Sequence, residues 1–410
     1  MAMQPHQKNH LSGSPAAWLA VIVLVVTGCA GNGTPNQNQT SEASHAANPT
    51  AAATDVPHHS EGGLKVGDPL PQGDAHPATL TPQEVYAVGE KSVFAIEGRR
   101  ADDFVGTGTG WVIDEASGNA VTNAHVVQGM TAISGRFNNG DKASLHVVAA
   151  DPCTDLAVVH FSAMPEVAES LILGKSADVK PGDSVTVLGF PGTLTNNPSE
   201  QKLIITAGLV NATKVPARPQ GAPEFKDTIQ HGATINYGNS GGPLLDHHGR
   251  VIGINTLTNF GSQNAPAQGQ FYSISIDSAK TEIVEKLMKG QSQNDLGWAA
   301  DEYYPGYFST LDQARGPALD ARLASQGIKG GLYVKAVAPG SEAQKAGISA
   351  GMLITKIQST STSTIAEMCA IAQSILPGTA VEVDGLHLLA SNGEHFSTSF
   401  HVTFTAPGKH

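Results

Sequence analysis

Short runs of β-branched and aromatic residues fill the chain from about residue 80 to Asp277, and they constrain its fold more than any other feature. Examples are "KSVFAIEGR", "GTGTGWVID", "TDLAVVHF" and "KLIITAGLVN", with Gly, Pro, Asn and Asp between them. Such a series is typical of an all-β sandwich or a pair of barrels. We therefore predict a mostly β domain over residues 81–290. Its last segment, capped by Asp277 and ended by Gly290, should be a helix.

A second, smaller domain is predicted over residues 291–410. The segment "GGLYVKAVAPGSEAQKAGISAGMLITKI" (330–357) indicates a strand, a turn, a short helix and another strand. Thr364 and Glu367 form a capping box for a helix over residues 365–376. Two further strands flank the turn "SNGE", which completes a small α+β unit.

The N-terminus predicts export from the cytoplasm. The apolar run from Ala16 to Val26 is too short for a comfortable membrane span and suits a secretory signal. Its end, "VTGC", resembles a bacterial lipobox, which implies a signal peptide over residues 1–28 and a lipid on Cys29 that tethers the chain to a membrane. An ordinary cleaved signal is the alternative. Residues 29–80 lack apolar bulk, and we predict a disordered linker.

Composition excludes some classes of function. The net charge is −12 and no basic run occurs, so a nucleic-acid partner is not expected. The three cysteines are too scattered for a zinc site or a disulfide framework. We predict Cys153 and Cys369 to be buried free thiols, with an oxidation switch at Cys153 as the alternative. No metal and no cofactor are expected.

Three residues form a candidate catalytic set. Ser240 lies among three glycines in "INYGNSGGPLLD" (235–246), His125 lies in "VTNAHVV", and Asp155 begins "DLAVV". Each residue alone has a structural explanation, as a turn or filler residue. Together, in the order His, Asp, Ser, they predict a nucleophile, a general base and a group that orients the base. The N–H groups of Gly238 and Ser240 would form the oxyanion hole.

The motifs "GTGTGWVID", "VTNAHVV", "DPCTDLAVV" and "INYGNSGGPLL", in this order, resemble the HtrA (Deg) family of trypsin-like serine proteases over residues 85–290. The resemblance implies a chymotrypsin-like double β-barrel with the site between the barrels. It also implies a substrate pocket walled by Ile235 and the strand from Asn255 to Thr258, suited to small aliphatic side chains.

Some features depart from the family's pattern. The family often has an acidic residue where this chain has Gly232, and the loop "GTLTNNPSEQK" (192–202) could reshape the site. Residues 291–410 resemble a PDZ domain, which implies binding of C-terminal peptides at a loop such as Leu296–Trp298. The long segment before residue 330 makes that match uneven.

These observations predict a membrane-tethered serine endopeptidase that acts outside the cytoplasm on misfolded or unfolded envelope proteins. The PDZ-like domain would select substrates or regulate cleavage, and the family resemblance implies a homotrimer. A peptide-binding or chaperone-like protein with a dormant triad is the first alternative. A protease dedicated to one partner is the second.

Overall fold

The computed structural model describes residues 79–100, 105–192, 198–260, 266–388 and 398–407. The side chains of residues 198, 257–260 and 266–269 are not part of this description. The predicted signal segment, Cys29 and the predicted linker to residue 78 lie outside the described residues. No helix within the described ranges is long and apolar enough to cross a membrane.

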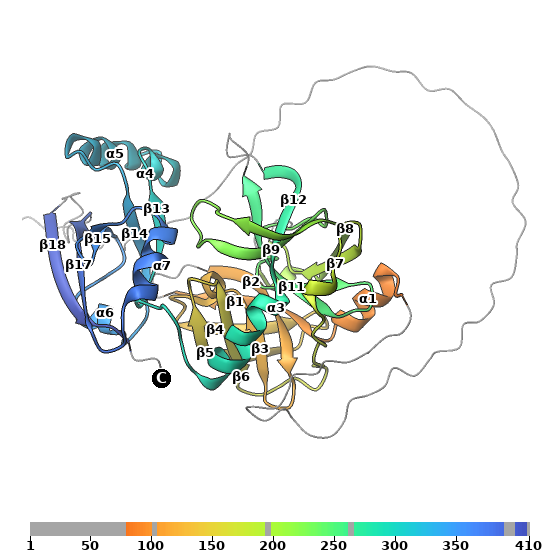
Figure 1. The fold of residues 1–410 in the computed structure, drawn as a ribbon. Helices are drawn as coiled ribbons and strands as arrows, with labels where there is room; N and C mark the ends of the chain where they lie inside the picture. The colour runs from red at the N-terminus through yellow and green to blue at the C-terminus, as the bar shows by residue number, and fades with distance from the viewer. Residues whose placement is uncertain (1–78, 101–104, 193–197, 261–265, 389–397, 408–410) are drawn as a thin grey trace, which may run out of the picture. The chain divides into compact units, whose positions relative to one another are not determined.

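Six antiparallel strands close into a first barrel, in the order β1-β2-β3-β6-β5-β4 (Figure 1). The barrel closes because β1 pairs with β2 on one side and with β4 on the other. Three packed aromatic rings, those of Phe94, Phe137 and Phe161, fill part of its interior. The strands are β1 (Val93–Arg99), β2 (Val105–Asp114), β3 (Asn119–Thr122), β4 (Ala132–Phe137), β5 (Lys142–Asp151) and β6 (Leu156–Phe161).

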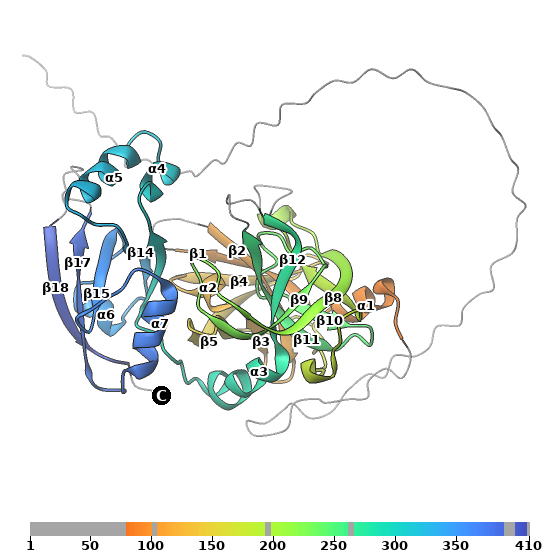
Figure 2. The same cartoon turned by 45° about the horizontal axis from the view of Figure 1, so that its top comes forward.

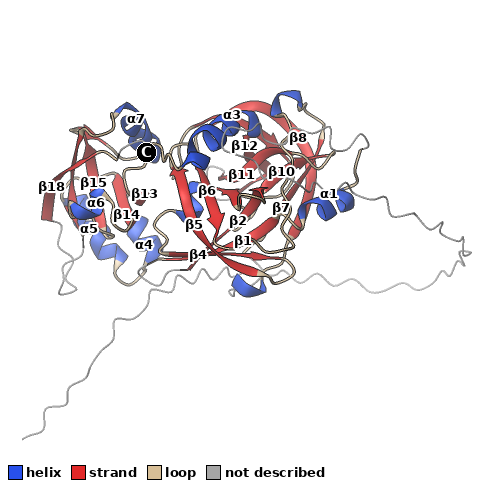
Figure 3. Ribbon diagram, turned by 90° about the horizontal axis from the view of Figure 1, so that it is seen from below, coloured by secondary structure: helices blue, strands red, loops and turns tan. Residues whose placement is uncertain are grey.

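A second closed barrel follows, in the order β10-β11-β12-β9-β8-β7. Figure 3 shows that strands dominate this part of the chain, with short helices around them. The strands are β7 (Ser184–Gly189), β8 (Ile204–Ala217), β9 (Phe225–His231), β10 (Pro243–Asp246), β11 (Val251–Phe260) and β12 (Pro266–Ser275). The short helices of the barrel region are α1 (Pro82–Gly89), α2 (Ala124–Val127), η1 (Ser176–Asp178) and η2 (Pro198–Glu200). The prediction of a mostly β chain with paired barrels is therefore confirmed.

The helix after the second barrel differs from its prediction. It begins at Ile276 as α3 (Ile276–Thr281) and continues as a π turn, η3 (Glu282–Lys286), and a 3₁₀ turn, η4 (Leu287–Lys289). Asp277 does not cap it, because its carboxylate accepts the Ala177 N–H at 2.8 Å. Gly290 ends the segment with φ +77°, as predicted.

The C-terminal part forms a third sheet, in the order β13-β14-β15-β17-β18 with β16 paired to β15. The capping box of Thr364 and Glu367 is present at the start of α7, as predicted. The sheet and helices match the small α+β unit and are consistent with a PDZ-like domain. The elements are β13 (Trp298–Tyr303), α4 (Tyr307–Leu311), α5 (Gly316–Ser325), β14 (Gly331–Val337), α6 (Glu342–Lys345), β15 (Met352–Ile357), β16 (Thr360–Ser361), α7 (Ile365–Ser374), β17 (Ala380–His387) and β18 (Thr398–Thr405).

The long segment between β13 and β14 folds into α4 and α5, which lie together beside one end of the third sheet (Figure 2). Its aromatic residues supply a separate small core. Tyr303, Tyr307 and Phe308 pack with Leu319 and Leu323 of α5. The segment is therefore an ordered part of the C-terminal unit.

The prediction of free thiols at Cys153 and Cys369 is wrong, because these cysteines form a disulfide. Cys153 lies in the turn between β5 and β6, and Cys369 lies on α7. The two residues are 216 positions apart, so only the tertiary fold brings them together. The bond links the first barrel to the third sheet's helix.

Candidate active site

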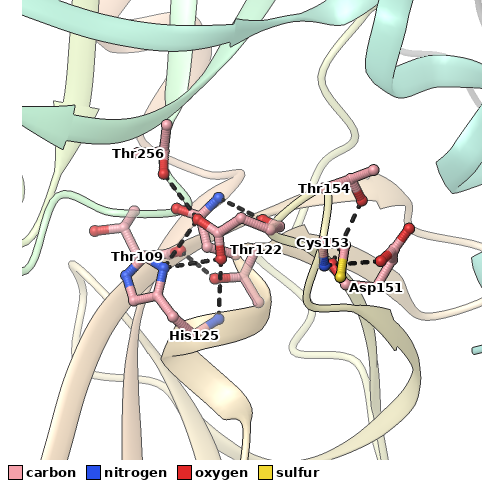
Figure 4. Close-up of polar contacts among 9 residues, drawn as sticks. Thr109, Thr122, His125, Asp151, Cys153, Thr154 and Thr256 are labelled. Carbon is pink, nitrogen blue, oxygen red and sulfur yellow. Dashed lines mark hydrogen bonds and ion pairs between the residues drawn. The ribbon is translucent and has the colours of Figure 1, made fainter. Parts of the chain in front are cut away.

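His125 is placed by the end of β3. The strand ends at Thr122, and α2 follows with His125 at its second position. The backbone N–H of His125 donates to Asp155 Oδ1 at 3.0 Å, and its Nδ1 lies 2.9 Å from both carboxylate oxygens (Figure 4). A carboxylate accepts only, so Nδ1 carries the proton and Nε2 is left as a base. The His125 side chain is half exposed, at 51%.

Asp155 is held in an uncommon backbone conformation just before β6. Its φ is +56°, in the left-handed region that Asp tolerates better than most residues. The Asn123 side chain donates to its carbonyl at 2.8 Å, and the Asp155 side chain is buried. These contacts aim the carboxylate at His125.

Thr256 also belongs to this group, although the sequence analysis did not identify it. Its hydroxyl donates to Asp155 Oδ2 at 2.7 Å from β11 of the second barrel (Figure 4). The Asp155 carboxylate therefore connects the two barrels. No local sequence signal marks Thr256, because it lies 101 residues from its partner.

The Ser240 loop is fastened to β2 of the first barrel through Thr109. The Thr109 hydroxyl donates to the Gly238 carbonyl at 2.7 Å and accepts the Phe190 N–H at 2.9 Å. The Thr109 N–H donates to the Ser240 carbonyl at 2.9 Å. The loop's position thus depends on contacts from both barrels.

Two glycines in this loop cannot readily be replaced. Gly238 has φ +98°, and a Cβ there would lie 2.5 Å from the Phe190 carbonyl oxygen. Gly241 has φ +86°, and a Cβ there would clash with Thr122 Oγ1 and the Thr109 carbonyl oxygen. Because Thr122 is three residues before His125, this close approach places the Ser240 loop against the strand end that carries His125.

The N–H groups of Gly238 and Ser240 do not donate to any other atom of the described chain. An oxyanion hole requires N–H groups that can donate to a ligand oxygen. No hydrogen bond between Ser240 and His125 is recorded among the described residues. Such bonds are often long or poorly aligned in a protein without substrate and shorten when substrate binds.

The residues predicted for substrate binding are mostly interior. Ile235 is buried in the core of the second barrel. Asn255 is fully buried, and its amide group donates to the Pro243 carbonyl at 3.0 Å and accepts from Ser273 Oγ at 2.8 Å. The backbone of Asn255 is also used inside the protein, because its N–H donates to the Gly242 carbonyl at 2.9 Å and its carbonyl accepts the Gly241 N–H at 2.8 Å. The Thr258 side chain lies outside the described side chains.

A buried histidine, His231, continues the hydrogen bonds between Asn255 and Ser273. His231 Nε2 lies 2.9 Å from Ser273 Oγ, which in turn donates to Asn255. Burial lowers the pKa of His231 to about 4. His231 is therefore neutral near pH 7 and supports the strand that accepts the Gly241 N–H.

The sequence of the barrel region is similar to that of known peptidases. Residues 108–254 match a model described as "Trypsin-like peptidase domain". The chain is 34% identical to human "Serine protease HTRA3" over 258 residues, 61% of this chain and 52% of that protein. It is 33% identical to a "Probable periplasmic serine endoprotease DegP-like" from Brucella suis over 276 residues, 67% of this chain and 48% of that protein.

The chain thus spans about half the length of these curated relatives. A solved structure, "HtrA-type protease AlgW with tripeptide", aligns at 24% identity over 80% of this chain and 97% of that chain, with a TM-score of 0.46. The chymotrypsin-like fold is assigned from the two closed six-stranded barrels. The family model and the curated relatives agree, and this chain belongs to the HtrA/Deg family of trypsin-like serine proteases.

Proposed function

We propose that this chain is a serine endopeptidase with Ser240, His125 and Asp155 as its catalytic triad. Ser240 Oγ would attack the carbonyl carbon of a peptide bond while His125 Nε2 takes its proton. The same proton would pass to the leaving amine, and water would then hydrolyse the acyl-enzyme. The observation that carries this proposal is the placement of His125 Nδ1 2.9 Å from both Asp155 oxygens.

The developing oxyanion would be bound by the N–H groups of Gly238 and Ser240. Their lack of other acceptors within the described chain supports this role. Loss of one such donor typically lowers turnover by about 100- to 1,000-fold. Thr256 would keep the Asp155 carboxylate oriented toward the imidazolium.

The substrates we propose are misfolded or unfolded proteins outside the cytoplasm, with the third sheet selecting peptide segments. The signal-like segment and Cys29 support export and a lipid tether. Incorporation of an alkyne fatty acid that is lost in Cys29→Ser would test the tether. The proposed homotrimer predicts three times the chain mass in light scattering, and a monomer at working concentration would contradict it.

Hydrolysis of casein, an unfolded protein, tests the proposed function. The full chain should cleave it into peptides, and Ser240→Ala should not. Ser162→Ala is the matched control, because Ser162 is an exposed serine next to β6 and lies outside the triad. Equal hydrolysis by Ser240→Ala would reject the assigned nucleophile. A folded wild type that cleaves nothing would favour the alternative, a peptide-binding protein with a dormant triad.

A further inference from the structure

Strand β13 and helix α7 border the place where the third sheet could take up another strand. In the described sheet β13 is an edge strand, and α7 lies next to it: the Ile365 N–H at the start of the helix donates to Glu302 Oε1 of β13 at 2.9 Å. Extended peptides bind many domains by adding to such an edge. We call the space between β13 and α7 the peptide edge.

The turn between β5 and β6, residues 151–154, reaches the peptide edge from the first barrel. We call it the Cys153 turn. Cys153 is bonded to Cys369 of α7 and is only 4% exposed. It belongs to the same apolar cluster as Trp298 of β13 and Met368 of α7, and every other fully buried member of that cluster lies in the C-terminal part. A residue of the barrel is thus built into the core of the other unit.

Polar contacts at the same place use groups that a bound peptide would need. The Gln128 side chain donates to the Trp298 carbonyl, the first acceptor of β13, at 2.8 Å. The Gly297 N–H, in the loop that would receive a terminal carboxylate, donates to Asp295 Oδ1 at 2.8 Å. The chain therefore satisfies both an edge acceptor and a loop donor by itself.

The linker before β13 holds the Cys153 turn from its other side. Asn294 Nδ2 donates to both carboxylate oxygens of Asp151, at 3.1 and 3.2 Å. Asp151 also accepts the Cys153 N–H at 2.8 Å, and Figure 4 shows both residues in the turn. The turn is therefore fastened by hydrogen bonds as well as by the disulfide.

We propose that the Cys153 turn is a built-in occupant of the peptide edge, and that reduction of the Cys153–Cys369 disulfide opens this edge to an extended peptide with a free C-terminal carboxylate. The inference rests on the part of the proposed function that assigns peptide binding to the third sheet. It adds that the Cys153–Cys369 disulfide prevents peptide binding at this edge until the bond is reduced.

The opening step requires a dithiol as reductant. One thiolate of the dithiol attacks a sulfur of the Cys153–Cys369 bond, which breaks and leaves a mixed disulfide and one cysteine thiolate. The second thiol of the reagent then displaces the other cysteine. Two electrons and two protons pass to the cysteines, and the reagent ends as its own disulfide. In an oxidising compartment the disulfide persists and the peptide edge stays covered.

Peptide binding before and after reduction tests the proposal. The full chain carries Cys29→Ser, so that Cys153 and Cys369 are its remaining cysteines. The probe is a pool of fluorescein-labelled nonapeptides randomised at the last three positions, and the same pool with amidated ends is the control. Fluorescence anisotropy should show at least about tenfold tighter binding of the carboxylate pool after dithiothreitol, because the competent fraction rises.

Cys369→Ser should bind the carboxylate pool without reductant as tightly as the reduced chain does. Hydrogen exchange at residues 298–303 should rise on reduction, since the edge loses its cover. Equal binding in both redox states, no binding in either state, or unchanged exchange at β13 would overturn the proposal.

Fluorophosphonate labelling in the same samples separates this inference from the proposed protease function. A chain that is labelled at Ser240 but shows no redox-dependent peptide binding contradicts only the proposed control by the Cys153–Cys369 disulfide. A chain that binds peptide on reduction but takes no label contradicts the protease alone. Anisotropy does not depend on the nucleophile, so each result can be assigned.

Discussion

At the scale of single residues, Thr256 gives the Asp155 carboxylate a partner that the sequence did not reveal. Replacing it by Val keeps the shape but removes the 2.7 Å hydrogen bond. A hydrogen bond to a charged group contributes about 1.5–3 kcal/mol, so we expect kcat/KM to fall by about tenfold or more.

Thr256→Ser is the matched control, because it keeps the hydroxyl and should restore the rate. If Thr256→Val had the wild-type rate, Thr256 would have no part in orienting Asp155. The measurement is kcat/KM of the three proteins on one peptide substrate.

His231 should make stability depend on pH. Its pKa in the fold, about 4, lies below the ordinary value of 6.5, so between these values the unfolded chain binds a proton that the folded chain does not. The stabilisation is therefore present above pH 6.5 and is lost as the pH falls toward 4, by up to about 3 kcal/mol. Urea unfolding at several pH values measures this loss.

His231→Gln should remove most of this loss while it keeps a polar group near Ser273. Burial raises the pKa of Asp151 to about 6, so this carboxyl stabilises the fold as the pH falls from 6 toward 4. Because this effect on stability opposes that of His231, the variant must be compared with the wild type at each pH. A difference between His231→Gln and wild type that stayed constant from pH 7 to pH 4 would contradict the assigned pKa.

At the scale of elements, the Ser240 loop requires glycine for two separate reasons. Gly241→Ala should suffer both the left-handed backbone, at about 1–2 kcal/mol, and a clash with β2 and β3. Gly140→Ala is the matched control, since Gly140 has φ +98° but nothing within 4 Å of a Cβ. We expect Gly140→Ala to lose stability alone, and Gly241→Ala to lose casein hydrolysis as well.

Thermal unfolding measures the stability of both variants, and casein hydrolysis measures their activity. Full activity in Gly241→Ala would show that the loop tolerates displacement and that its close approach to Thr122 is not needed.

Local patterns predicted the elements where the decisive contacts are themselves local. The capping box of Thr364 and Glu367 is a contact across three residues, and α7 begins where it predicts. The cap at Asp277 is wrong because a residue 100 positions away, Ala177, takes its carboxylate. Helix starts are therefore predictable from sequence only when no distant donor competes for the capping group.

At the scale of the whole molecule, the sequence predicted the fold class and the glycine-rich surroundings of Ser240. It did not predict the groups that bind the units to one another. Thr256 reaches Asp155 across 101 residues, and Cys153 reaches Cys369 across 216. Scattered cysteines indicated no disulfide because spacing along the chain carries no information about such distant pairs.

Labelling of Ser240 by a fluorophosphonate tests the central claim most directly, because the reagent reacts with an assembled serine nucleophile. The full chain and Ser240→Ala are treated with and without casein, and the modified peptide is identified by mass spectrometry. The account predicts label on the wild-type peptide that contains Ser240 and none on Ser240→Ala. A wild-type chain that is folded by circular dichroism but stays unlabelled, even with casein present, would contradict it.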